Sequence, residues 1–319
     1  MFSKESHGGG RYGRAVGAAA VTATVCLAGG GAGGSSAPHA DGSGSASDSG
    51  PGSASTDNKA GSPSASHSAT PSASPTPPAT SSAETLPLTG EVVVLDPGHN
   101  PTNYQHTKEI NRLVDIGTNR KECDTTGTET NAGYAEASYT LDVSRRVRAI
   151  LLARGAKVTL TQDGNLPFGP CVDQRAEIGN KAHADAALSI HADGAPASAH
   201  GFHVIAPKSL HAGGADTRAI AAPSLRLATT LRAHFKAATG EPFADYLGGG
   251  KGLMVRDDLG GLNLSTVPKV FIECGNMRNA TDAKSLTNPA WRQRAAQGIA
   301  DGLTAFLESS TQNSADGKR

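Results

Sequence analysis

The 319-residue chain carries no net charge, because its 29 Lys and Arg residues balance its 29 Asp and Glu residues. This balance argues against electrostatic capture of nucleic acid or of an acidic membrane surface. Aromatic residues make up 4% of the chain, which is too few for a platform that stacks bases. Four cysteines are too few for a disulfide scaffold, so any disulfide reinforces a fold that a hydrophobic core must hold.

Residues 1–40 are predicted to be a signal peptide region. Residues 1–14 are polar and basic, and residues 15–28 are almost wholly apolar and small. The apolar run is too short for a comfortable membrane span, so we expect cleavage in the small-residue stretch that follows it. The sequence therefore predicts a protein that is secreted or held in the cell wall, outside the cytoplasm, with no membrane span after cleavage.

Cys26 raises the alternative of a lipoprotein. The residues before it, Ala23-Thr24-Val25, lack the small residue expected directly before a lipidated cysteine. We therefore favour an ordinary residue of the discarded apolar segment.

Residues 41–86 are predicted to be a disordered linker. They consist mostly of Ser, Pro, Ala, Gly and Thr, and such a segment cannot bury enough surface to offset its ordering entropy. A flexible tether of about 45 residues reaches roughly 35–40 Å. One catalytic domain is then expected over residues 87–309, and the polar residues 310–319 are expected to form a disordered tail.

Short apolar strands alternate with amphipathic helices in this domain. Strands are predicted at residues 92–95, 157–161, 185–190, 202–206 and 269–273, and helices at residues 131–153, 172–182, 223–238 and 291–307. The alternation predicts an α/β fold, a three-layer open and mostly parallel twisted sheet with helices on both faces. Residues 100–130 are predicted to be a long loop, and a loop of that length is usually functional.

Three predicted strands end in residues that carry chemistry. The apolar run before Asp96-Pro97-Gly98 stops at this turn signal, and His99 follows it. The strand that begins at Asp185 ends at His191, and the last strand ends at Glu273. Because the carboxyl ends of parallel strands meet at one edge of a sheet, we expect these side chains to converge. The alternative for His99 alone is a turn histidine without a partner.

Glu136 joins this set through helical spacing. It lies one turn before Tyr139, in line with the apolar stripe that continues through Val143 and Val147. Its charge would be buried there unless a positive group meets it. The alternative is a glutamate that turns to solvent and interacts with the helix dipole. Two imidazoles and one carboxylate form a known ligand set for catalytic zinc, with a fourth position left to water.

Three segments, VVVLDPGHN, RAEIGNKAHADAALSIHAD and GLNLSTVPKVFIECGNMRN, resemble the zinc-dependent N-acetylmuramoyl-L-alanine amidases of cell-wall remodelling. The blocks DPGH, SIHA and E-x-GN are each weak signals, but together and in this order they are highly specific. The resemblance implies one Zn²⁺ per chain, with His99, Glu136 and His191 as its ligands. It also implies that Glu273 is the catalytic acid and base.

The resemblance implies hydrolysis of the amide bond between the N-acetylmuramoyl lactyl group and L-alanine in peptidoglycan, for cell-wall remodelling or daughter-cell separation. We expect a monomer whose partner is peptidoglycan. A zinc peptidase that cuts peptidoglycan cross-links is an alternative, since both scissile bonds are amides. A non-catalytic wall-binding protein on an amidase scaffold is another, and the presence of all four site residues argues against it. Asn100 and Asp193 depart from the family pattern and leave the expected metal ligands unchanged.

Two cysteines outside the signal peptide region, Cys123 and Cys171, are expected to form a disulfide in an exported protein, with two free thiols as the alternative. Cys274 is interpreted as a small buried hydrophobic residue, and a thiol nucleophile is the rival interpretation. Asp96 is a candidate neighbour of the metal ligands. His203 lies between Phe202 and Val204 in a predicted strand and is expected to face solvent.

Overall fold

The computed structural model describes residues 86–316, with side chains as far as residue 312. The predicted signal peptide region and nearly all of the predicted linker lie outside the described residues. Within residues 86–316, none of the helices combines the length and the apolar character that a membrane crossing requires.

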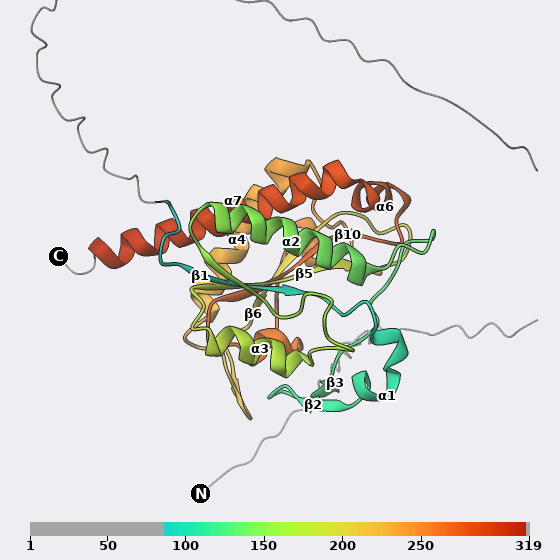
Figure 1. The fold of residues 1–319 in the computed structure, drawn as a ribbon, viewed down its shortest axis with the longest axis horizontal. Helices are drawn as coiled ribbons and strands as arrows, with labels where there is room; N and C mark the ends of the chain where they lie inside the picture. The colour runs from blue at the N-terminus through green and yellow to red at the C-terminus, as the bar shows by residue number, and fades with distance from the viewer. Residues whose placement is uncertain (1–85, 317–319) are drawn as a thin grey trace, which may run out of the picture. The chain divides into compact units, whose positions relative to one another are not determined.

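A six-stranded sheet forms the centre of the described chain (Figure 1). Its strands are β1 Val92–Pro97, β4 Lys157–Leu160, β5 Ala186–Asp193, β6 His203–Pro207, β9 Leu253–Arg256 and β10 Lys269–Asn276. Their spatial order is β4-β1-β5-β10-β6-β9. The first four strands of this order are parallel, β6 is antiparallel to β10, and β9 is parallel to β6. The prediction of a mostly parallel sheet is therefore confirmed.

Helices cover both faces of the sheet, as Figure 1 shows for the three long helices on one side and α3 on the other. The helices are α2 Glu136–Ala153, α3 Val172–Lys181, α4 Ala221–Thr239, α5 Gly260–Asn263, α6 Ala280–Thr287 and α7 Pro289–Asp316. The α2, α4 and α7 helices pack together, and the short α5 helix contacts α3. This arrangement is the three-layer α/β architecture that the alternating pattern predicts.

The main hydrophobic core lies between the sheet and the layer of α2, α4 and α7. The α2 stripe of Tyr139, Val143 and Val147 is fully buried in it, and α7 contributes Ile299 and Leu303. Burying a side chain of this kind contributes about 1.5–3 kcal/mol. Helical spacing in the sequence therefore identifies the buried faces of both helices correctly, and this packing fixes where the first turn of α2 lies.

Residues 100–130 are organised into short elements and are not the plain loop that was predicted. They contain the 3-10 helix η1 Asn103–Gln105, the helix α1 Thr107–Ile110 and the hairpin of β2 Leu113–Asp115 and β3 Arg120–Glu122. The expected disulfide between Cys123 and Cys171 is present and joins the end of this segment to the start of α3. Both cysteines pack against Val114 and Ile116 in a small core of their own.

Four predicted boundaries are wrong. The last strand, which was expected to end at Glu273, continues to Asn276. The helix predicted from residue 131 begins at Glu136, because the preceding residues form a turn closed by a bridge between Glu129 and Ala135. The strand predicted to end before His191 continues to Asp193. The tail predicted to be disordered from residue 310 is helical as far as Asp316, because α7 continues through it.

Several short elements were not predicted at all. Besides β9, α5 and α6, they are the hairpin of β7 His211–Ala212 and β8 Ala215–Asp216 and the 3-10 helix η2 Gly248–Gly250. All of these except the eight-residue α6 have two to four residues. Elements that short leave no room for a hydrophobic period, so composition alone does not reveal them.

Candidate active site and metal centre

Three side chains from distant parts of the chain meet at the carboxyl edge of the sheet. His99 follows β1, Glu136 opens α2 and His191 lies in β5. Nε2 of His99 is 3.2 Å from Oε2 of Glu136, and Nδ1 of His191 is 2.9 Å from Oε1 of Glu136. One ligand atom of each residue lies within 4.8 Å of the other two. The structure therefore brings the three residues of the sequence hypothesis to spacings that suit one divalent ion.

Glu136 is 4% exposed, which rules out the alternative of a glutamate that turns to solvent. Its Oε2 accepts a hydrogen bond from the Thr128 N–H at 2.9 Å, and its Oε1 accepts one from the Ala192 N–H at 3.1 Å. Burial alone would raise the pKa of this carboxyl, but His99 and His191 outweigh burial and lower the pKa well below its usual range. Glu136 is thus a carboxylate aimed at two imidazoles.

His99 is held by its backbone as well as by its ring. Its φ of 61° lies in the left-handed region, which is costly for a residue with a Cβ. Its carbonyl accepts hydrogen bonds from Nε2 of Gln162 at 3.1 Å and from Nη2 of Arg175 at 3.0 Å. On the ring, Nδ1 lies 3.1 Å from the carbonyl oxygen of Thr125, which leaves Nε2 to face Glu136. A carbonyl partner of this kind orients a metal-binding imidazole.

Arg175 links His99 to a buried network of charges. Its Nη1 donates to Oδ1 of Asp96 at 2.8 Å, and its Nη2 donates to Oδ2 of Asp124 at 2.9 Å. Lys269 adds a second cation, 3.1 Å from Oδ2 of Asp96. Burial would raise the pKa of Asp124, but Arg175 and His99 outweigh it and lower the pKa to about 2. Sequence reasoning anticipated Asp96 as a neighbour of the metal ligands and a structural role for Arg175, but it did not anticipate Asp124 or Lys269.

The two imidazoles differ in their electrostatics. Burial lowers the pKa of His99, but the Glu136 carboxylate and Asp124 outweigh burial and raise the pKa well above its usual value. For His191, burial dominates and, together with the charge on His99, lowers the pKa in spite of Glu136. The surroundings of His191 favour its neutral form, and the carboxylates around His99 favour a positive charge at that position. Two imidazoles and the Glu136 carboxylate in such surroundings form a donor set that fits a divalent cation.

Glu273 lies beside this set, because it is the register partner of His191 on the neighbouring strand β10. Among the described residues its Oε2 is buried and has no hydrogen-bond partner. Burial, reinforced by the carboxylates of Asp193 and Glu136, raises the pKa of Glu273 well above its usual range. A buried carboxyl group with a free oxygen and a raised pKa is suited to take up and release a proton.

Two glycines leave room for these side chains. A Cβ on Gly98 would lie 2.2 Å from the ring of His191. Gly127 has a φ of +74°, and a Cβ there would lie 2.8 Å from both Oε2 of Glu136 and Cδ2 of His99. Sequence reasoning missed Gly127, because a glycine in a long loop gives no sign of the side chains it will meet.

His203 is 2% exposed, so the prediction that it faces solvent is wrong. It is the register partner of Glu273 on β6, a strand that is covered on both faces. Tyr246, which was also missed, donates a hydrogen bond to Oδ2 of Asp193 at 2.8 Å, with its ring centroid 6.1 Å from that of His203. His203 thus borders Glu273 on the side away from His191, whereas Asp193 belongs to the strand of His191.

Cys274 is fully buried, and burial raises the pKa of its thiol. A thiol with a raised pKa is a poor nucleophile at neutral pH, which favours the interpretation of a small hydrophobic residue.

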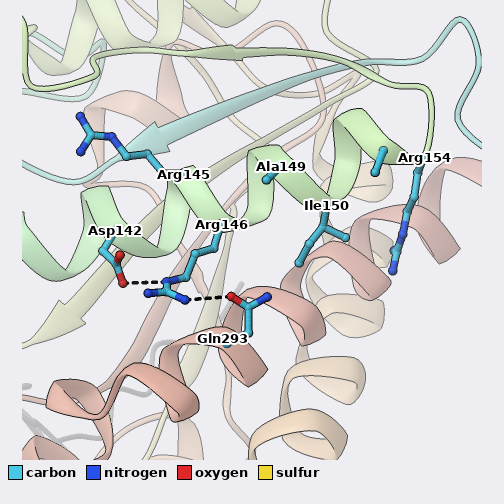
Figure 2. Close-up of a pocket in the computed structure, with 8 residues that line it drawn as sticks. Asp142, Arg145, Arg146, Ala149, Ile150, Arg154 and Gln293 are labelled. Carbon is cyan, nitrogen blue, oxygen red and sulfur yellow. Dashed lines mark hydrogen bonds and ion pairs between the residues drawn. The ribbon is translucent and has the colours of Figure 1, made fainter. Parts of the chain in front are cut away.

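A surface groove of about 600 Å³ lies between α2 and α7 (Figure 2). Arg146 crosses it, donating to Asp142 at 2.9 Å and to Gln293 at 2.9 Å. Arg145 points away from this pair in the same view. None of the residues that line this groove belongs to the His99 set, and none is a histidine or a cysteine. The groove is therefore separate from the proposed active site.

The fold and the site together define an α/β enzyme with a candidate metal centre at the carboxyl edge of its sheet. The chain belongs to the N-acetylmuramoyl-L-alanine amidase family, whose model, Amidase_3, matches residues 93–305. Members of this family are hydrolases that act in the cell wall, and the fold, the enzyme class and the resemblance predicted from the sequence are thereby confirmed.

Individual relatives agree with this assignment. The N-acetylmuramoyl-L-alanine amidase Rv3717 of Mycobacterium tuberculosis is 38% identical over 242 residues, which cover 74% of this chain and 95% of the relative. The crystal structure of Ami1 from Mycobacterium smegmatis is 40% identical, with a TM-score of 0.63, and the match covers 70% of this chain and 99% of that chain. The apo form of Ami1 from Mycobacterium abscessus is 42% identical, with a TM-score of 0.62 and coverages of 69% and 100%.

Proposed function

We propose that this protein is a zinc-dependent amidase that hydrolyses the bond between the lactyl group of N-acetylmuramic acid and L-alanine in peptidoglycan. The observation that carries the proposal is the convergence of His99, Glu136 and His191, with Glu273 on the adjacent strand. Family membership supports the choice of substrate, and the donor set supports zinc.

In this proposal each residue has a separate role. His99, Glu136 and His191 would hold the zinc ion, which would supply Lewis-acid chemistry and lower the pKa of water toward about 7. Glu273 accepts the proton of the attacking water and returns it to the leaving amine, for which its raised pKa is suited. Arg175 and Asp124 act through His99, because they hold its carbonyl and face its Nδ1.

The test is digestion of purified peptidoglycan by the full chain, followed by mass analysis of the products. An amidase releases stem peptides with a free N-terminal L-alanine and leaves bare glycan strands. A chelator should abolish the release, and added Zn²⁺ should restore it. Stem peptides that lose their cross-links but stay attached to the glycan would establish the peptidase alternative and overturn the proposal.

We also propose that the protein works outside the cytoplasm as a monomer. The basic and apolar segments before residue 29 support export, and the Cys123–Cys171 disulfide suits an oxidising compartment. Detection of a shortened protein in the wall or culture medium of an expressing bacterium, and its mass in solution by light scattering, test the two parts separately. An unprocessed cytoplasmic protein would contradict the first part, and a stable dimer would contradict the second.

A further inference from the structure

A second group of ligating side chains lies outside the proposed active site. His200 precedes β6, Glu241 follows α4 and Asp282 lies in the first turn of α6. One donor atom of each residue lies within 4.8 Å of the other two, as in the His99 set. The proposed amidase mechanism uses none of them.

The two carboxylates of this second group are buried. Asp282 is 0% exposed, and its Oδ1 lies 2.7 Å from Nδ1 of His200. Its Oδ2 accepts hydrogen bonds from the N–H groups of Gly201 at 2.8 Å and Asn276 at 2.9 Å. The Oδ2 atom of Asp282 thus accepts two backbone hydrogen bonds, and its Oδ1 atom faces the imidazole of His200.

Glu241 is the group without a partner. It is 6% exposed, and its Oε1 is buried and accepts no hydrogen bond from any described residue. Leaving a buried polar atom unpaired costs about 1–3 kcal/mol, and more for a charged group. The geometry therefore calls for a positive partner at this point.

Within the described residues, Lys and Arg side chains do not supply that partner. Asp282 forms its ion pair with His200, and Glu241 forms none. Lys236 is the lysine nearest to Glu241 in the sequence, and its ammonium group lies 4.6 Å from the centroid of the Phe243 ring.

We propose that His200, Glu241 and Asp282 bind a second divalent metal ion of the first transition series, such as Zn²⁺ or Mn²⁺. One imidazole nitrogen and two carboxylates form a mixed donor set that suits these ions. Two carboxylates also balance the charge of a divalent ion. The partly exposed His200 leaves an approach from solvent and room for water ligands.

This ion has a structural role in the proposal. It ties together the chain before β6, the end of α4 and the start of α6. Asp282 already holds the N–H of Asn276, in the same strand as Glu273. Gly201 lies so close to the segment after Glu241 that a Cβ would sit 2.7 Å from the Pro242 carbonyl oxygen. The second site thus fixes the connections that support the end of β10.

The experiment is calorimetric titration of the full chain with Zn²⁺, and in parallel with Mn²⁺, after treatment with a chelator. Four proteins are compared: the wild type, His99→Ala, Glu241→Gln and the double variant. We expect two equivalents of Zn²⁺ in the wild type, one in each single variant and none in the double variant. Glutamine has nearly the same shape as glutamate, and Glu241→Gln removes a buried charge, so we expect this variant to fold.

Thermal unfolding provides a second measurement. Zn²⁺ should raise the unfolding midpoint of His99→Ala, and this shift should vanish when Glu241→Gln is added, whereas Glu177→Gln on the exposed surface of α3 should preserve it. If the wild type and Glu241→Gln bound the same number of Zn²⁺ equivalents, the second metal site would be overturned. The carboxyl groups of Glu241 and Asp282 would then share a proton in place of a metal ion. Equal stoichiometry in the wild type and His99→Ala would instead count against the proposed active site, so the two failures are distinguishable.

Discussion

Among single residues, Glu273 is the one on which the proposed chemistry depends. Replacing it with glutamine removes the proton acceptor and keeps the shape, so we expect Glu273→Gln to slow amide cleavage by about 10²–10⁴-fold. Zinc content should stay unchanged, because Glu273 is not among the three proposed ligands. Peptide release from peptidoglycan and elemental analysis measure the two quantities.

The matched control is Glu308→Gln, which changes an exposed glutamate on α7. It should keep the parent rate. Parent-like cleavage by Glu273→Gln would remove the proposed acid and base from the mechanism.

Arg175 makes a second prediction at this scale. Arg175→Met leaves Asp96 and Asp124 buried with less positive charge around them, and breaking a buried pair in this way costs about 3–5 kcal/mol. Urea unfolding should show a lower midpoint. Arg218→Met, which removes an exposed partner of Asp216, should leave the midpoint nearly unchanged. Equal midpoints for both variants would mean that the network contributes little to stability.

Asp124 predicts an acid limit to stability. Its pKa in the fold is about 2, below the ordinary value of 3.8, so folding favours the ionised form. This contribution is fully present above about pH 4 and is lost as the pH falls through 2. Chelator-treated wild type should therefore lose stability over this window, and Asp124→Asn should lose less. Parallel curves for the two proteins would contradict the assigned pKa.

Some residues of the site were predictable and others were not, for physical reasons. His99, His191 and Glu273 follow or lie near the carboxyl ends of apolar strands, so local pattern and sheet geometry place them together. Glu136 needed both the helical stripe and the family resemblance. Asp124 and Lys269 were not predictable, because no local period shows which distant charge a buried carboxylate will meet.

Among the elements, the segment of residues 100–130 supports the site through its disulfide. The bond between Cys123 and Cys171 closes 48 residues of chain, and loop-closure entropy for that length stabilises the fold by about 4 kcal/mol. The same segment supplies Thr125 to His99 and Thr128 to Glu136.

A double variant, Cys123→Ala with Cys171→Ala, should therefore unfold at lower denaturant concentration and bind Zn²⁺ more weakly at the His99 set. Unfolding curves and metal titration measure the two effects, with Cys274→Ala as a control for the loss of a buried sulfur outside the disulfide. Unchanged zinc affinity would show that the segment keeps its position without the bond.

Sequence patterns at the element scale reveal long elements better than their ends. The buried stripes of α2 and α7 follow from helical spacing. The start of α2 does not, because the turn and the bridge at Ala135 depend on a backbone partner at Glu129. The sequence does not reveal the helical continuation to Asp316, because its residues are polar and polar composition is typical of disorder.

For the whole molecule, the proposed zinc ligands connect β1, α2 and β5, so metal binding and folding are linked. Free Zn²⁺ at one hundred times its Kd stabilises the folded state by about 2.7 kcal/mol. Chelation should lower the thermal midpoint of Glu241→Gln, a variant in which only the His99 set is left to respond. If the chelator did not change the thermal midpoint of this variant, metal binding at the His99 set would be contradicted.

The two ends of the described chain lie at the opposite edge of the sheet from His99. Leu86 leads into the start of β1, and near the end of α7 the Thr311 hydroxyl donates to Oε1 of Glu91 at 3.0 Å, which Figure 1 shows as two ends on one side. The described chain therefore begins and ends at the edge of the sheet opposite the proposed active site. An attachment made through Leu86 therefore leaves the edge of the sheet that carries His99 free.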